Sequence, residues 1–193
     1  DNPKALSNTF KLFVSFLKNE QLVSGETIAI DGTKVRAYNS KKQNYSAKKL
    51  ERHLVYIETK TNEYLTALAE NDEQEDAIKV SDVAQKIERL KTNKIYYEQL
   101  QEKLAESGDT QISVTDADAR ALLVQGQVVE VAYNVQAAVD AKHNLVVATH
   151  TINKNDRNAL SAIAKEAKAN LEVETYTALV DKGYHNGRQI DQC

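Results

Sequence analysis

Two short apolar segments of this chain each lead directly into an aspartate. Residues 27–30 (TIAI) precede Asp31, and residues 176–180 (YTALV) precede Asp181. Segments of this length and composition are typical of buried strands covered on both faces, and ligand sites in α/β sheets lie just beyond strand ends. We therefore expect Asp31 and Asp181 at a sheet edge, where a pair of carboxylates without thiolate or imidazole partners would suit Mg²⁺ or Mn²⁺.

The bulk composition indicates a soluble protein of the reducing cytoplasm. The chain has 193 residues, of which 41% are hydrophobic, enough for one sizeable core with an appended helical part. Its single cysteine, Cys193, excludes an intrachain disulfide and a thiolate metal site. No apolar stretch approaches the roughly 20 residues that span a bilayer, which argues against a membrane partner. Because methionine is absent, we expect this chain to be a piece of a longer protein.

Helical spacing of apolar residues predicts a helix over residues 3–18 and a pair of long helices over residues 46–106. Two apolar stripes define the pair: Leu50, Leu54, Ile57, Tyr64 and Leu68, then Val83, Ile87, Leu90, Tyr97 and Leu104. An acidic segment, residues 70–76, separates the stripes. This pattern favours an antiparallel helical hairpin whose stripes pack on each other.

The remaining segments predict a hairpin of strands, a helix and a further strand. Period-two alternation begins beyond Gly126, with Asn134 and Gln136 on the polar face, and a loop near residue 142 leads into a returning strand that ends at residue 152. A helix is expected over residues 157–171 with Asp156 as its cap, followed by the strand that ends at Asp181.

The expected order divides the chain into three parts. Residues 1–45 hold the N-terminal helix and the first strand, residues 46–106 form the helical hairpin, and residues 107–193 contain the rest of the core. The last of these parts ends with the start of a helix capped by Asn186.

Basic residues are concentrated directly after the first strand, although the net charge of the chain is −3. Residues 34–52 contain a single acid, Glu51, and seven cations: Lys34, Arg36, Lys41, Lys42, Lys48, Lys49 and Arg52. This stretch has two interpretations, a surface along which a phosphate backbone lies and an ordinary solvated helix face with its loop. Lys182 adds a cation beside the second aspartate and, with Lys34 and Arg36, could hold a phosphate there.

Five motifs in order resemble those of bacterial insertion-sequence transposases of the DDE type. They are Ile30-Asp31-Gly32-Thr33-Lys34, Thr115-Asp116-Ala117-Asp118-Ala119-Arg120, the segment from Tyr133 to Asp140, Asn155-Asp156-Arg157 and Asp181-Lys182-Gly183-Tyr184. The resemblance covers nearly the whole chain. It implies a mixed α/β sheet of the RNase H-like fold, in which three antiparallel strands precede a helix and a fourth strand runs parallel to the first. The helical hairpin would then be an insertion between the first and second strands.

The resemblance also implies DNA transposition, that is, metal-dependent phosphodiester hydrolysis and strand transfer at transposon ends. In this family three acids hold two divalent ions, Mg²⁺ or Mn²⁺. Asp31 would be the first catalytic and metal-binding acid and Asp181 the second. The third, a glutamate on a helix downstream of the second aspartate, has no match here, so we expect the fragment to be inactive alone. The implied partners are DNA, both transposon ends and target, and a second copy of the chain in a homodimer. The DNA-binding candidates are Lys34, Arg36, Lys41, Lys42, Lys48, Lys49 and Lys182.

Two alternatives remain. The chain could be a catalytically silent module derived from a transposase that binds DNA or another protein, and metal binding distinguishes this from an enzyme core. It could also be another RNase H-like phosphotransferase such as a sugar kinase. That activity would require phosphate-loop glycines after the first aspartate, where the sequence offers only Gly32.

Overall fold

The computed structural model describes residues 2–71, 77–124, 126 and 128–193. The chain divides into two compact units. The first extends from the N-terminus to Tyr38 and continues with Asp118–Cys193, and the second is Asn39–Ala117. Helices and a mixed sheet make this an α+β architecture.

A five-stranded mixed sheet forms the centre of the first unit. Its strands are β1 (Thr27–Arg36), β4 (Arg120–Val124), β5 (Val128–Asp140), β6 (Leu145–Ile152) and β7 (Thr177–Val180). β5 pairs antiparallel with β1 along one edge and antiparallel with β4 and β6 along the other, while β7 pairs parallel with β1. The predicted strands are thus present, and β4 is an additional strand that the sequence pattern did not indicate.

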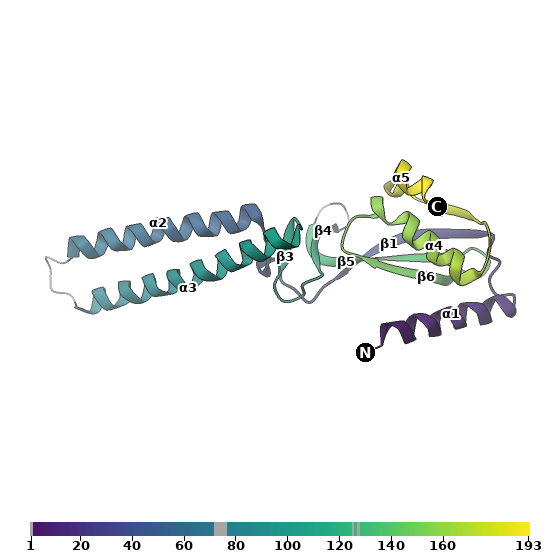
Figure 1. Cartoon of the computed structure of the whole chain (residues 1–193), viewed down its shortest axis with the longest axis horizontal. Helices are drawn as coiled ribbons and strands as arrows, with labels where there is room; N and C mark the ends of the chain where they lie inside the picture. The colour runs from purple at the N-terminus through teal and green to yellow at the C-terminus, as the bar shows by residue number, and fades with distance from the viewer. Residues whose placement is uncertain (1, 72–76, 125, 127) are drawn as a thin grey trace. The chain divides into compact units, whose positions relative to one another are not determined.

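The helices α1 (Pro3–Asn19) and α4 (Leu160–Leu171) contribute to one core with the strands β1, β5 and β6 (Figure 1). The buried residues of this core include Val14, Leu17, Ile28, Ile30, Ala138, Val147, Ile163 and Ala167. The helix predicted for residues 3–18 is confirmed. Its expected apolar face is only partly buried, because Leu6 and Phe13 remain 74% and 52% exposed.

The expectation of strands covered on both faces is wrong within the described residues. In β1 the buried Ile28 and Ile30 alternate with the exposed Ala29 and Asp31, and all of β7 is exposed. The physical reason is that the helices pack on one face of the sheet, and that β7 lies at the end of the strand order with only β1 beside it.

The second unit contains the predicted helical hairpin. Helices α2 (Ala47–Asn71) and α3 (Ala77–Ser107) run side by side in opposite directions (Figure 1). At their base they pack on a short two-stranded sheet of β2 (Asn44–Ser46) and β3 (Gln111–Ser113). The predicted stripes point inward, with Leu50, Ile57, Ile87 and Leu104 buried. Most of the acidic segment expected between the helices, residues 72–76, lies outside the described residues.

Within the described part of the chain, no helix combines the length and the apolar character needed to cross a membrane.

Asp140 anchors the start of β1 to the end of β5. Its side chain is fully buried and accepts hydrogen bonds from the backbone amides of Ser24, Gly25 and Lys142 at 3.0, 2.8 and 2.9 Å. Burial acts to raise the pKa of Asp140, but these amide hydrogen bonds outweigh it, and the pKa lies below its usual value.

We expect Asp140→Asn to lower the free energy of unfolding at neutral pH by about 2 to 4 kcal/mol, because an amide places a donor among backbone donors. Since the folded pKa is depressed, the wild-type carboxylate stabilises the fold above its unfolded pKa of about 4, and this stabilisation is lost as the pH falls. Urea unfolding between pH 7 and pH 3 should therefore show a smaller decline for the variant than for the wild type. Parallel pH profiles would contradict this assignment.

Candidate functional site

Asp31, which lies within β1, and Asp181, which directly follows the neighbouring parallel strand β7, are here called the acidic pair. The β1–β7 register places Ile30 opposite Val180, and each aspartate is the next residue along its strand direction. Adjacent strands of a sheet lie about 4.8 Å apart. The register therefore places the two aspartates at the same level of the sheet, but only Asp181 follows the end of a strand, because β1 continues past Asp31 to Arg36.

Both members of the acidic pair are exposed and are oriented by local backbone amides. The Asp31 Oδ1 atom accepts from the Gly32 amide at 2.7 Å, and the Asp181 Oδ1 atom accepts from the Gly183 amide at 2.7 Å. Asp181 thereby caps the short 3₁₀ helix η3 (Lys182–Tyr184). These two contacts hold the carboxylates in place and use only one oxygen atom of each.

The donor chemistry of the acidic pair fits a hydrated hard cation. Mg²⁺ prefers oxygen ligands, keeps several of its waters and is commonly bound by one or two carboxylates together with substrate phosphates. Among the described residues, no group of three or more His, Cys, Asp or Glu side chains is arranged to hold a metal ion. The pair is therefore suited to weak binding that a phosphate ligand would strengthen.

A third carboxylate, Asp156, organises a polar cluster on the buried face of β1 and β5. It lies in the 3₁₀ helix η2 (Asp156–Asn158), ahead of α4. Its Oδ1 atom accepts from Asn134 Nδ2 at 2.8 Å and from Gln136 Nε2 at 3.0 Å, and its Oδ2 atom accepts from Lys34 Nζ at 2.8 Å. Both oxygens of Asp156 are therefore engaged in binding neighbouring side chains.

The predicted role of Asp156 as a helix cap is wrong. Asn155 and Ala159 occupy the cap positions of η2 and α4, and the Asp156 side chain turns toward β1 and β5 instead. The Asp156 carboxylate lies there because it accepts hydrogen bonds from Lys34, Asn134 and Gln136, which stabilise its charged form. Burial acts to raise the pKa of Asp156, but the hydrogen bonds from Lys34, Asn134 and Gln136 and the charge of Lys34 lower it below its usual value.

Gly32 makes this cluster possible by leaving room beside β1. A Cβ atom at this position would lie 2.2 Å from Gln136 Nε2, 2.6 Å from Asp156 Oδ1 and 2.8 Å from Asn134 Oδ1. Asn134 and Gln136 are both fully buried. The polar face predicted for β5, with Asn134 and Gln136, is therefore the face that packs inside the unit.

Tyr184 connects the cluster to the segment that carries Asp181. Its hydroxyl donates to Gln136 Oε1, and its ring is buried in the main core. Burial, followed by the negative charges of Asp156, Asp31 and Asp181, raises the pKa of Tyr184 well above its usual range. The three carboxylates thus act on the same buried hydroxyl, which remains protonated at physiological pH.

The three basic candidates of the first unit differ in their surroundings. Lys34 is mostly buried and paired with Asp156 at 2.8 Å, whereas Arg36 is largely exposed and lies 3.3 Å from Glu130. Lys182 is exposed directly after Asp181. Of these cations, Lys34 is the one most firmly fixed by the fold.

The basic candidates of the second unit also separate into two kinds. Lys41, Lys42 and Lys48 have exposed side chains. Lys49 instead donates to the backbone carbonyls of Lys41, Lys42 and Asn44 at 3.1, 2.9 and 2.7 Å, and its ammonium lies 4.5 Å from the centre of the Tyr45 ring. Lys49 therefore has a structural function at the base of the hairpin.

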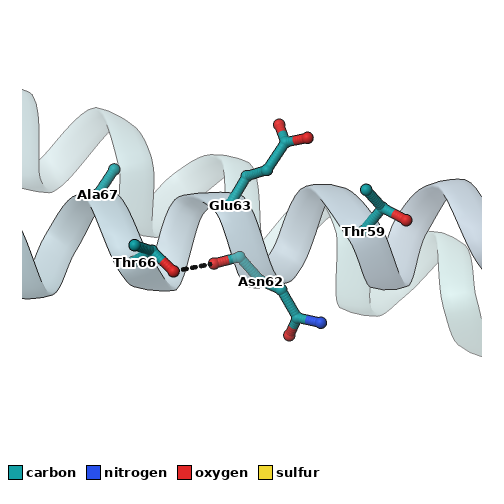
Figure 2. Close-up of a pocket in the computed structure, with 5 residues that line it drawn as sticks. All are labelled: Thr59, Asn62, Glu63, Thr66 and Ala67. Atoms are coloured by element: carbon teal, nitrogen blue, oxygen red, sulfur yellow. Dashed lines mark hydrogen bonds between the residues drawn. The ribbon is translucent and has the colours of Figure 1, made fainter.

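A separate hollow of about 540 Å³ lies along α2 and contains none of the predicted site residues (Figure 2). It is lined by Thr59, Asn62, Glu63, Thr66 and Ala67. The Thr66 hydroxyl donates to the Asn62 carbonyl oxygen at 3.0 Å, and the Glu63 carboxylate is paired with Lys60 at 2.5 Å. Its polar groups thus have partners on the helix itself.

Sequence reasoning did not identify the cluster around Asp156. The segments Asn155-Asp156-Arg157 and Tyr133–Asp140 stand out in the sequence, but capping and surface exposure are the simpler interpretations of their polar residues. The available signal was the alternation of two amides, Asn134 and Gln136, with apolar residues in a strand that must be central. Such amides need buried partners if the helices cover their face.

Comparison with known proteins identifies no relative of this chain. No family model matches it, and no curated protein or solved structure has detectable similarity to it.

Proposed function

We propose that this chain is the catalytic-core part of a bacterial DNA transposase of the DDE type. Asp31 and Asp181 would bind Mg²⁺ or Mn²⁺ for hydrolysis and strand transfer at DNA phosphodiesters. The observation that carries the proposal is the register of β1 and β7, in which the two aspartates follow the paired residues Ile30 and Val180. The five sequence motifs suggest the family. The register explains why the first and the last motif belong together, because it places Asp31 and Asp181 at the same level of the sheet.

The strand order supports the RNase H-like part of the proposal. The antiparallel strands β1, β5 and β6 are followed by α4 and by β7, which is parallel to β1, and the additional strand β4 precedes β5. This is the order that the resemblance implies, with the helices α2 and α3 placed between the first and second of these strands. The proposal therefore treats the second unit as an insertion in an RNase H-like core.

The proposed mechanism assigns distinct tasks to the residues of this chain. When bound, a pair of divalent ions would activate the attacking water or 3′-hydroxyl and stabilise the leaving oxygen. Asp31 and Asp181 would bind the metal through the oxygens that their local amides leave accessible. Lys182, exposed beside Asp181, would contact the scissile phosphate and offset its negative charge. Arg36 would contact the DNA farther along β1.

We expect no cleavage of DNA by this chain alone, because the described residues provide two acids where the family uses three. A DNA cleavage assay with Mn²⁺ should compare this chain with a version extended by a downstream helical segment that carries a glutamate. Strand cleavage by the extended protein, abolished by Asp31→Asn, would support the proposal. An extended protein that binds Mn²⁺ but never cleaves DNA would contradict it.

A catalytically silent module is the second candidate, and one observation favours it. No three acidic, histidine or cysteine side chains of the described segments form a metal-binding group. In that case the basic residues of the second unit would still bind DNA or another protein, while Mn²⁺ would bind neither aspartate. Metal titration therefore separates the two candidates, and in either case we place the protein in the bacterial cytoplasm.

DNA binding gives a prediction for the exposed lysines of the second unit. Replacing Lys41, Lys42 and Lys48 with glutamine should weaken binding to duplex DNA. It should also reduce the slope of log K against log salt by about 0.9 for each phosphate that the protein no longer neutralises. Fluorescence anisotropy at several salt concentrations measures both quantities. Lys49 is left intact because its ammonium holds three carbonyls of the fold.

The matched control replaces Lys91 and Lys94 with glutamine. These lysines are exposed on α3 of the same unit, and their partners are Glu88 and Glu98 of that helix, at 3.7 and 3.8 Å. A loss of affinity per replaced lysine that is the same in both variants would reduce the effect to net charge and would assign Lys41, Lys42 and Lys48 to an ordinary solvated surface.

A further inference from the structure

Asp156 links β1, which carries Asp31, to η3, which follows Asp181. Through Lys34 it is bound to β1, through Asn134 and Gln136 to β5, and Gln136 in turn accepts from the Tyr184 hydroxyl in η3. Asp181 is the residue that precedes η3 and caps it. A continuous chain of side-chain contacts therefore runs from one strand of the acidic pair to the segment that carries its second member.

This chain of contacts compensates for the weak attachment of η3 to the sheet. β7 pairs with β1 over only four residues, all exposed, and pairing ends at Val180 before Asp181 is reached. Beyond that point Tyr184 is the buried residue of η3. The position of the Asp181 carboxylate thus depends on how firmly Tyr184 is held.

We propose that Asp156 is a positioning residue for the acidic pair, acting through Gln136 and Tyr184 to hold η3, and with it the Asp181 carboxylate, beside the end of β1. This inference rests on the proposed function, in which the acidic pair binds a divalent cation. Asp156 itself is not a metal ligand in this scheme, since both of its oxygens accept hydrogen bonds from side chains.

The substitution Asp156→Asn tests this role with almost no change in side-chain volume. Every contact of the Asp156 carboxylate comes from a donor, so an amide in either orientation directs an NH₂ group at a donor. The oxygen of the new amide should face the charged Lys34 ammonium, so its NH₂ group faces Asn134 and Gln136. We then expect η3 to loosen, because Gln136 loses its acceptor. Removing a group that orients a metal ligand typically weakens metal binding by about 10- to 100-fold, and we expect at least a tenfold rise in the Kd for Mn²⁺.

A second variant, Tyr184→Phe, keeps the buried ring and removes only the hydroxyl that binds Gln136. It should weaken Mn²⁺ binding in the same direction. The control is Glu166→Gln, which removes a carboxylate of the same unit whose partner is His150 at 3.5 Å. This control should leave Mn²⁺ affinity unchanged.

The second readout is the exchange rate of the Gly183 amide hydrogen, measured by NMR without metal. This amide donates to Asp181. Its exchange should be about tenfold faster in Asp156→Asn and Tyr184→Phe, relative to the amides of β5 in the same sample. A purely structural role would instead accelerate exchange throughout the sheet in parallel.

The outcomes are distinguishable. Weaker Mn²⁺ binding with faster Gly183 exchange in both variants supports the inference. Unchanged Mn²⁺ affinity and Gly183 exchange, with normal binding by the wild type, overturn the positioning role and leave the proposed function intact. If the wild type does not bind Mn²⁺ but Gly183 exchange still accelerates in the variants, the proposed function fails while the positioning of η3 stands. If Asp156→Asn does not fold, the Mn²⁺ affinity and the Gly183 exchange rate of Tyr184→Phe decide between these outcomes.

Discussion

Gly32→Ala should destabilise the protein by about 1 to 3 kcal/mol, the range expected when a well-packed site is forced to accept an extra methyl group. The new Cβ atom would lie 2.2 Å from Gln136 Nε2 and 2.6 Å from Asp156 Oδ1, far inside contact distance. β1 cannot move away, because it is paired with β5 on one side and β7 on the other. The Asp156 cluster must therefore open to admit the methyl group.

Thermal and urea unfolding measure this effect. For a protein of this size, such a loss corresponds to a fall in Tm of roughly 2 to 12 °C. The matched control is Gly187→Ala at the start of α5 (Gly187–Asp191), where an added Cβ meets no atom within 4 Å. Its stability should stay within about 0.5 kcal/mol of the wild type. Equal free energies of unfolding for Gly32→Ala and Gly187→Ala would mean that the Asp156 cluster does not require the space beside Gly32.

Asp31→Asn and Asp181→Asn should each abolish measurable Mn²⁺ binding. Each variant halves the number of carboxylates in a site that has two, and an amide oxygen is a neutral and weaker ligand for a hard cation. Folding should be retained, because asparagine keeps an oxygen that can accept from the Gly32 or Gly183 amide. Isothermal titration or Mn²⁺ relaxation measures the loss.

The control for these variants is Asp191→Asn, which removes an exposed acid from α5 of the same unit. It should bind Mn²⁺ as the wild type does. If all three variants lose affinity equally, the binding follows net charge and the acidic pair is not a specific site.

Periodic patterns of the sequence predicted the elements that are defined by local spacing. The stripe that contains Leu50 and Ile57 predicted α2, and alternation beyond Gly126 predicted the β5–β6 hairpin. Asn186 was predicted to cap a helix, and its side chain accepts from the Arg188 amide. These features depend on residues close together in the chain, so the sequence carries their signal directly.

Tertiary contacts determined the features that were not predicted. Asp156 precedes a helix and was interpreted as its cap, yet Lys34, 122 positions earlier in the chain, is its ion-pair partner. Asn134 and Gln136 alternate like solvent-facing residues, but their face is covered by the core. β4 is short and owes its identity to pairing with β5. Only the three-dimensional arrangement reveals such long-range partners.

The central claim is that Asp31 and Asp181 bind one cation together, and paramagnetic broadening by Mn²⁺ tests it most directly. The amides of Gly32 and Gly183 each donate to one member of the acidic pair at 2.7 Å, so they report on the two carboxylates separately. Substoichiometric Mn²⁺ should broaden both amide resonances at the same concentrations and before those of other acidic segments. Broadening of one without the other, or broadening centred elsewhere in the chain, would contradict the account.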